Sequence, residues 1–251
     1  MPDEPTLSPE PAASSDLRPR DPLLGSRRLR RRFASIQAAA IAGIICAAGW
    51  SLSLRGLLAS PDTDAPDAEI IRFYADPTAR PPAVMLLQLL VVSTIAFLWF
   101  VGVVRGRLGD NEPKLFGTVF FGASILMAGL LFIGTALLAA PSVLVEIGGK
   151  PPDPGAASLT RAAAAAILSV FAPRIATLVM FSTAGLGRST GALPQWLVWL
   201  TYGVGTASFV NVTIARPTIY VFPAWIALVS VVLLLRRPPH GFDLAPEPGS
   251  S

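Results

Sequence analysis

The stretch SRRLRRRFASIQAAAIAGIICAAGWSLSLR, residues 26–55, decides the fold. Five arginines precede 22 consecutive residues without a charge, from Phe33 to Leu54, and Arg55 closes the run. An α-helix crosses the roughly 30 Å hydrocarbon core of a bilayer with about 20 apolar residues, whereas the core of a cleaved secretory signal is only about 7–15 residues long. The stretch therefore predicts a membrane-spanning anchor, whose basic segment 27–32 is expected to bind anionic lipid.

Five further apolar segments of spanning length follow this stretch. The third span is predicted to end near Ala139, because Pro141 has no backbone N–H and interrupts helical hydrogen bonding. The fourth contains Pro173 and Arg174 near its middle. The sequence therefore predicts an all-α fold, a polytopic transmembrane helix bundle, with six spans at residues 33–54, 83–104, 115–139, 159–187, 193–215 and 217–235.

The overall composition favours a membrane protein over other classes. Of the 251 residues, 52% are apolar and 14% are charged, whereas soluble domains carry about 25% charged residues. The net charge of +4 comes from basic residues beside an apolar span and not from a basic surface with interleaved aromatic residues, so we expect no nucleic-acid partner. Cys46 and His240 are the single residues of their types, and we expect no metal, cofactor or catalytic residue.

The distribution of Lys and Arg predicts the orientation. With the N-terminus inside, 13 of these residues lie on the cytoplasmic side and six on the outer side, while Arg174 lies within the fourth span. Because cytoplasmic loops are enriched in Lys and Arg, both termini are predicted to be cytoplasmic, in the cell inner membrane. Residues 1–32 and 238–251 are predicted to be disordered tails. They flank a transmembrane domain of residues 33–237 with an outer loop at 55–82.

Small and aromatic residues predict helix packing and membrane anchoring. The first span carries five small residues at successive i+4 positions: Ser35, Ala39, Gly43, Ala47 and Ser51. Because close backbone contact favours helix association in lipid, this stripe is expected to pack against a neighbouring span or, alternatively, against a second copy in a homodimer. Gly122 and Gly129 mark a similar face on the third span. Trp196 and Trp199 lie where indole rings anchor a helix at the membrane interface.

Arg174 lies near the middle of the fourth span, 13 residues from Arg161 and 14 from Arg188. A charge at that depth costs about 2.5–3.5 kcal/mol on insertion scales. Helical side chains lean toward the N-terminus of their helix, so the guanidinium is expected to rise toward the outer leaflet. Candidate partners and ligand-binding residues there are Gln88, Asn211, Tyr202, Ser169 and Thr177. The guanidinium either pairs with backbone carbonyls at a bend or a watery crevice, or binds an anionic or carbonyl-bearing ligand; a re-entrant helix pair is a third arrangement.

The first outer loop carries an amphipathic segment. In residues 68–76, Ile70, Phe73 and Tyr74 share one helical face. This pattern predicts a short helix lying at the outer interface. A ligand-binding lid is the alternative.

Four short strings carry a resemblance to a known group. They are FYAD at 73–76, LWF at 98–100, LPQWLVWL at 193–200 and FPAW at 222–225. These strings resemble those of an uncharacterised group of six-span bacterial integral membrane proteins, over about residues 68–236. Because no activity is assigned to that group, the resemblance implies the topology and no chemistry.

Three functions follow, each with its own structural expectation. The first is a non-enzymatic partner or regulator of membrane proteins, favoured by an Arg174 that is bound to backbone carbonyls in a dry bundle. The second is a small facilitator or carrier, favoured by a polar, water-reachable crevice that converges on Arg174. The third is a membrane-embedded enzyme that uses outer-loop acids, favoured by clustering of Asp76 with Glu146 or Asp153. The spans contain no carboxylate or histidine of the kind that ion-coupled carriers use.

Overall fold

The computed structural model describes residues 22–107, 114–189, 191, 193–211 and 216–235. The chain divides into two units, residues 1–34 and 35–251. The first unit contributes the beginning of helix α1, and all side-chain contacts described below lie in the second. Within the described residues, all regular structure is helical, which confirms the predicted all-α class.

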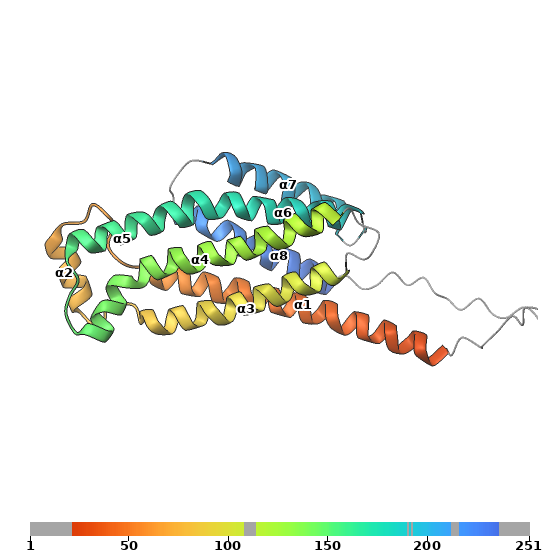
Figure 1. Ribbon diagram of the computed structural model, residues 1–251, viewed down its shortest axis with the longest axis horizontal. Coiled ribbons are helices and arrows are strands. Elements are labelled where there is room, and N and C mark those ends of the chain that lie inside the picture. The colour runs from red at the N-terminus through yellow and green to blue at the C-terminus, as the bar shows by residue number, and fades with distance from the viewer. Residues whose placement is uncertain (1–21, 108–113, 190, 192, 212–215, 236–251) are drawn as a thin grey trace, which may run out of the picture. The chain divides into compact units, whose positions relative to one another are not determined.

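The described residues form mainly long helices (Figure 1). In order they are α1 (Pro22–Leu57), α2 (Asp67–Ala75), α3 (Ala83–Arg107), α4 (Lys114–Gly148), α5 (Pro154–Ala166), the π-helix η1 (Ile167–Phe171), α6 (Ala172–Ser189), α7 (Gln195–Val210), the 3-10 helix η2 (Arg216–Tyr220) and α8 (Val221–Leu235). Helix α4 packs against α3, α5 and α6, and α6 packs against α7.

Five helical segments are long and apolar enough to cross a membrane: Gln37–Leu57, Ala83–Arg105, Gly117–Gly148, Pro154–Ser189 and Pro217–Leu235. They match five of the six predicted spans. The sixth prediction, residues 193–215, corresponds to α7, which has only 16 helical residues. Five candidate spans are therefore established by length and composition, and the sixth crossing stays a prediction.

Two predicted boundaries differ from the structure. Helix α1 begins at Pro22, within the segment predicted to be a disordered tail. The prediction that Pro141 ends a helix is wrong, because α4 continues through it to Gly148. Contacts beyond the proline account for this continuation: Val145 packs against the α2–α5 cluster, and the Glu146 carboxylate binds the first turn of α3. Residues 1–21 and 238–251, predicted as tail segments, lie outside the described residues, as do residues 236 and 237 at the end of the predicted transmembrane domain.

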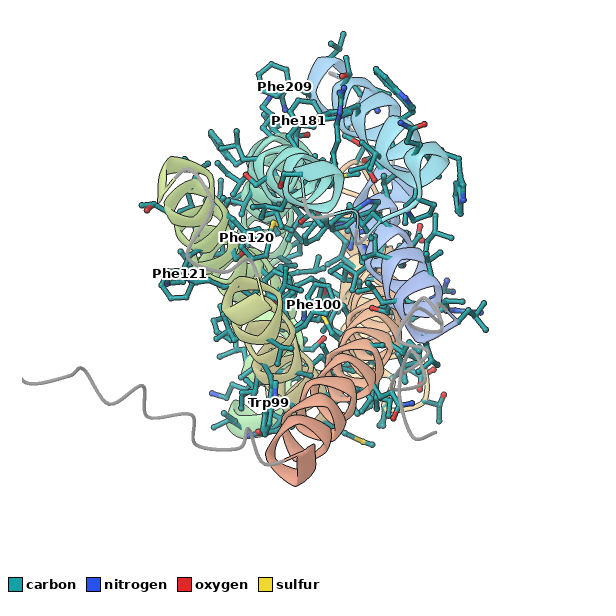
Figure 2. The ribbon with its side chains drawn as sticks, turned by 90° about the vertical axis from the view of Figure 1, so that its right-hand side faces the viewer. Trp99, Phe100, Phe120, Phe121, Phe181 and Phe209 are labelled. Carbon is teal, nitrogen blue, oxygen red and sulfur yellow. The ribbon has the colours of Figure 1, made fainter. Side chains whose placement is uncertain are left out.

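Neighbouring residues on the long helices lie on different faces, one buried and one exposed, as the pairs labelled in Figure 2 illustrate. On α3, Phe100 is 1% exposed, whereas Trp99 is 65% exposed. On α4, Phe120 is fully buried and the adjacent Phe121 is exposed. Soluble monomers rarely present contiguous apolar patches larger than a few hundred Å². Apolar side chains on the outward faces of spanning-length helices are instead typical of a lipid-facing surface.

An aromatic cluster joins α1, α3 and α8. The rings of Trp50 and Phe97 lie 4.9 Å apart between centroids, and Phe222 lies 6.1 Å from Trp50 and 5.6 Å from Trp225. The indole Nε1 of Trp50 donates to Thr94 Oγ1 at 3.1 Å, so the polar atom of this buried ring is paired. The cluster therefore holds three helices that are far apart in sequence.

Glycines on α1 allow close approach of α3 and α8. A Cβ atom built on Gly49 would overlap the Ser93 side chain of α3, and one built on Gly43 would overlap the Ser230 hydroxyl of α8. Ala39 and Ala47 are buried beside them. The part of the predicted stripe from Ala39 to Ala47 therefore packs within this chain, with Ser51 half-buried at its end.

The predicted face on α4 behaves differently from the stripe on α1. No atom lies within 4 Å of a Cβ built on Gly122 or Gly129, so neither glycine is packed against the described part of the chain. The close approach on α4 is instead at Gly134, where a Cβ would lie 2.7 Å from the Leu168 side chain. The spacing of glycines in the sequence did not distinguish Gly134, which is closely packed, from Gly122 and Gly129, which are not.

The prediction for this interface is that Gly49→Leu destabilises the protein in detergent by about 1–3 kcal/mol, because the added side chain overpacks the α1–α3 contact. The unfolding midpoint of purified protein measures the effect. Gly122→Leu is the matched control and is expected to leave the midpoint nearly unchanged. Equal midpoints for the two variants would contradict the α1–α3 packing.

Candidate functional site

Arg174 lies at an irregular point of the long α5–η1–α6 segment. The π-helix Ile167–Phe171 ends where the Ala172 N–H donates to the Ile167 carbonyl, five residues earlier. Pro173 follows at once and supplies no N–H, so the normal i→i−4 ladder is interrupted here. The Arg174 Nη1 donates to the Val170 carbonyl at 2.5 Å, and the residue is half-buried. The guanidinium thus pairs with the backbone of its own interrupted turn.

The other residues predicted around Arg174 do not converge on it. Gln88 is exposed on α3. The ring of Tyr202 on α7 lies 5.4 Å from that of Phe181, which is two turns further along α6 than Arg174. Thr177 Oγ1 lies within hydrogen-bond distance of two backbone carbonyls, those of Pro173 and Gly205. No hydrogen bond or ring contact joins any of these three candidates to Arg174 in the described part of the chain.

Asn211 and Ser169 instead border a cleft beside Pro173. Asn211 is the C-cap of α7, and its N–H donates to the Ala207 carbonyl at 3.0 Å. The cleft has a volume of about 190 Å³ and is lined by Ser169, Pro173, Val204, Ala207, Ser208, Asn211, Thr218 and Val221. It therefore lies where α6, the end of α7 and η2 meet.

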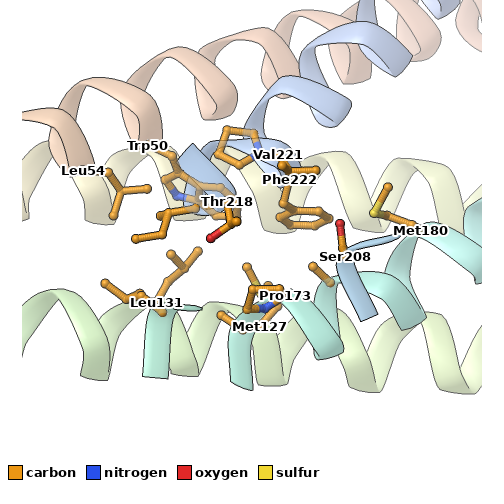
Figure 3. A pocket seen from close by; sticks show the side chains of 15 residues that line it. Trp50, Leu54, Met127, Leu131, Pro173, Met180, Ser208, Thr218, Val221 and Phe222 are labelled. Atoms are coloured by element: carbon orange, nitrogen blue, oxygen red, sulfur yellow. The ribbon is translucent and has the colours of Figure 1, made fainter. Parts of the chain in front are cut away.

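A narrower, largely apolar hollow adjoins this cleft and reaches α1 and α4. Figure 3 shows the side chains that line the hollow. Pro173, Ser208, Thr218 and Val221 line both spaces. The far side of the hollow is formed by Trp50, Leu54, Met127, Leu131 and Phe222, among others. Ser208 and Thr218 were not identified from the sequence, because no sequence pattern indicates which residues of α7 and η2 face Pro173.

The outer-loop acids are bound separately and do not cluster. The Glu146 carboxylate accepts from the Ala83 and Val84 N–H groups, at 2.7 and 3.2 Å, and so caps α3. Asp153 Oδ1 accepts from the Ala156 N–H at 2.9 Å and caps α5. Asp76 accepts hydrogen bonds from the side chain and backbone of Thr78, which lower the pKa of its carboxyl group. The described residues contain no group of three or more His, Cys, Asp or Glu that could hold a metal.

A polar contact near the beginning of the fourth candidate span ties the loop after α1 to α5. Arg161 donates to the Ser60 hydroxyl and forms an ion pair with Asp62, 3.6 Å between Nη2 and Oδ1. Burial raises the pKa of the Tyr74 phenol on α2, an effect that the nearby Ser60 and Arg161 partly offset. The predicted helix at 68–76 is confirmed as α2, with Ile70 and Tyr74 buried. In the sequence, Arg161 was only one of the basic residues counted to predict the orientation, and its contacts with Ser60 and Asp62 were not predicted.

The two predicted membrane anchors are exposed on the first turns of α7. Trp196 is 55% exposed and Trp199 is 64% exposed. Trp199 also contacts Tyr202, with ring centroids 6.2 Å apart. Their exposure is compatible with anchoring at a membrane interface, which stays a prediction.

Comparison with known proteins returned no match: no family model, curated protein or solved structure is significantly similar to this chain. The resemblance to a six-span bacterial group therefore stays an expectation from the short strings alone.

The contact at the irregular turn predicts that Arg174→Leu lowers stability in detergent by about 1–3 kcal/mol, because the Val170 carbonyl loses its charged donor. Arg174→Lys retains a donor and is expected to recover part of this loss. Arg188→Leu, at the exposed end of the same helix, is the control and should change the unfolding midpoint little. An Arg174→Leu variant as stable as the control would contradict a structural role for the guanidinium.

Proposed function

We propose that the protein is a six-span integral protein of the bacterial inner membrane, with both termini in the cytoplasm. Its proposed role is that of a non-enzymatic partner or regulator of other membrane proteins. The five apolar helices of spanning length support membrane insertion. The bias of 13 Lys and Arg residues on the proposed inner side against six on the outer side supports the orientation.

The direction of α7 supports the sixth crossing. Thr177 contacts the Gly205 carbonyl, and the Tyr202 hydroxyl lies 3.8 Å from a Cβ built on Gly185, so α7 runs antiparallel along α6. Its 16 residues span about 24 Å, slightly less than the hydrocarbon core. A short span is accommodated by local thinning of the bilayer or by flanking residues. With this crossing, the chain ends on the side where it began.

The bond between Arg174 and the Val170 carbonyl is the observation that supports a structural over a transport role for this arginine. The cleft beside Pro173 is largely apolar, and Arg174 does not line it. The outer acids likewise have separate local partners: Glu146 and Asp153 cap helices, and Asp76 binds Thr78. These arrangements match the expectations given for a partner or regulator more closely than those for a carrier or an enzyme.

Cysteine labelling tests the topology. Cys46 is buried, so Cys46→Ser provides a background to which single cysteines are added at Ser8, Thr63 or Ser250. In sealed, right-side-out vesicles, a membrane-impermeant maleimide is expected to label only the variant with cysteine at position 63. The variants at positions 8 and 250 should react only after the vesicles are opened. Labelling of position 250 from outside would contradict the six-span topology.

Reconstitution of the purified protein into vesicles distinguishes the proposed regulatory role from a transport role. Purified protein in vesicles should not increase the uptake of small anions such as formate or inorganic phosphate. An uptake that is present in the wild type and lost in Arg174→Lys would contradict the proposed role and support the carrier alternative.

A further inference from the structure

The cleft beside Pro173 is a site that the proposed role does not use. We propose that it binds one neutral lipid with a flat, carbonyl-bearing ring, an isoprenoid quinone, whose ring lies between the apolar walls and whose carbonyl accepts a hydrogen bond from Ser169. The proposal concerns binding alone and includes no redox step. It rests on the bilayer placement that is part of the proposed function, but it does not depend on a regulatory role.

The Ser169 hydroxyl is a donor that lacks an acceptor in the protein. Ser169 is only 6% exposed and lines the cleft, and none of the described residues forms a hydrogen bond with its hydroxyl. Other buried hydroxyls in the spanning helices, such as those of Ser124 and Thr183, donate to the carbonyl four residues earlier in their own helix. Because Ser169 lies within the π-helix, its helical register differs from theirs.

The unpaired Ser169 oxygen opens into the cleft. Among the described residues, the only fully enclosed side-chain oxygen or nitrogen without a partner is that of Ser230, on α8. The Ser169 oxygen therefore retains some open surface, and the cleft is the space that this residue lines. A carbonyl group in the cleft would provide the missing acceptor.

The lining of the cleft favours an uncharged occupant. The described residues that line it contribute no charged side chain, and their polar groups are hydroxyls and the amide of Asn211. Ser169 lies eight residues from Arg161, or about 12 Å further along the helix from the outer polar boundary. A charge at membrane depth without a partner is costly. A lipid whose carbonyl is tied to a phosphate or a carboxylate therefore does not fit this position.

A quinone ring satisfies these requirements. The ring is flat and neutral, and its two carbonyl oxygens accept hydrogen bonds. Its tail is an isoprenoid hydrocarbon, so no charged or strongly hydrated group has to accompany the ring into the bilayer, where an unpaired polar group is expensive to bury. The carbonyls of glycerol-based lipids are instead attached to a polar group that remains at the membrane surface.

The dimensions and walls of the cleft also suit such a ring. Val204, Ala207 and Val221 provide apolar contact. The volume of about 190 Å³ exceeds that of an engineered apolar cavity of about 150 Å³ that binds benzene, so a substituted ring has room. Phe209 and Val210, on the same turn of α7 as Ala207, are 54% and 67% exposed. The isoprenoid tail would leave the cleft along this lipid-facing surface.

Ser208 links the cleft to the adjoining hollow. It lines both spaces, as its place among the side chains of Figure 3 illustrates, and it is half-buried. None of the described residues forms a hydrogen bond with its hydroxyl either. A larger side chain at this position would therefore occupy space that the quinone ring needs.

Binding of menaquinone with a tail of four isoprene units to the full-length chain tests the proposal. The protein is immobilised in mild detergent and equilibrated with the quinone over a range of concentrations, and retained quinone is extracted and quantified by its absorbance. The wild type is expected to saturate at one quinone per chain. Ser208→Leu should weaken binding by roughly tenfold or more, a loss equivalent to about 1.4 kcal/mol or more.

Thr206→Leu is the matched control for the blocking variant. Thr206 is exposed on the same helix, two residues away, and lines neither space, so this variant should bind menaquinone as the wild type does. Equal unfolding midpoints for the two leucine variants establish that Ser208→Leu is folded. If its midpoint falls, Ser169→Ala, which removes a single oxygen atom, decides the outcome.

The carbonyl contact is tested with an analogue that carries the same tail on a naphthalene ring and lacks both carbonyls. Ser169→Ala should bind menaquinone roughly fivefold more weakly than the wild type does, as expected for one lost neutral hydrogen bond. Its affinity for the naphthalene analogue should equal that of the wild type. Because each compound is compared between two proteins, its partition into detergent micelles cancels.

Three results would overturn the quinone site: no saturable menaquinone binding by the wild type, undiminished binding by a folded Ser208→Leu variant, or an equal effect of Ser169→Ala on the two compounds. A bound phospholipid or detergent molecule that menaquinone does not displace would also overturn it. The maleimide labelling at positions 63 and 250 reports topology and not quinone binding, so a failure of this site is distinguishable from a failure of the proposed membrane placement.

Discussion

The structure depends on one constraint: inside a bilayer, backbone N–H and C=O groups have no water to bind and must be hydrogen-bonded within the protein. In hydrocarbon, each unpaired N–H or C=O costs several kcal/mol, so interruptions of a spanning helix need local donors or acceptors. The Arg174 guanidinium supplies a donor to Val170 at the irregular turn, and Thr177 lies within reach of carbonyls on two helices. At the beginning of α3, the Glu146 carboxylate accepts from the first N–H groups of that helix. The charged side chains of Arg174 and Glu146 therefore stabilise the backbone by pairing with its polar groups.

Close packing is the second constraint, because apolar burial alone gives little preference for one helix neighbour over another in lipid. Helix α1 meets α3 through Gly49 and α8 through Gly43. The indole N–H of Trp50 donates to the Thr94 hydroxyl, and that of Trp225 donates to the Thr201 hydroxyl. These contacts combine shape with a specific hydrogen bond. They select an arrangement of helices whose outward faces are largely apolar, and the cleft beside Pro173 is a place where this packing is incomplete.

The sequence predicted the features that depend on local composition, and missed those that depend on contacts between distant residues. Charge-free runs located five helices of spanning length, and the period of Ile70 and Tyr74 located α2. Pro141 was predicted to end a helix, but contacts beyond it keep α4 helical. The π-helix before Pro173 has no signature in composition. Gln88 was grouped with Arg174, but its helix α3 packs against α4, and Tyr202 on the neighbouring α7 lies beside Phe181, two turns from Arg174. The packing of η1 against η2 beside the cleft was equally inaccessible from the sequence.

The central claim is that these helices lie in hydrocarbon, and hydrogen–deuterium exchange of the protein in vesicles tests it most directly. Helix α3 is decisive, because only a third of its most apolar window is buried by protein, so lipid must exclude water from the rest. The account predicts that amides across Val91–Phe100 stay protected for hours, while those of α2 (Asp67–Ala75), outside the membrane, exchange far faster. Exchange of the α3 segment as fast as that of α2 would contradict the account.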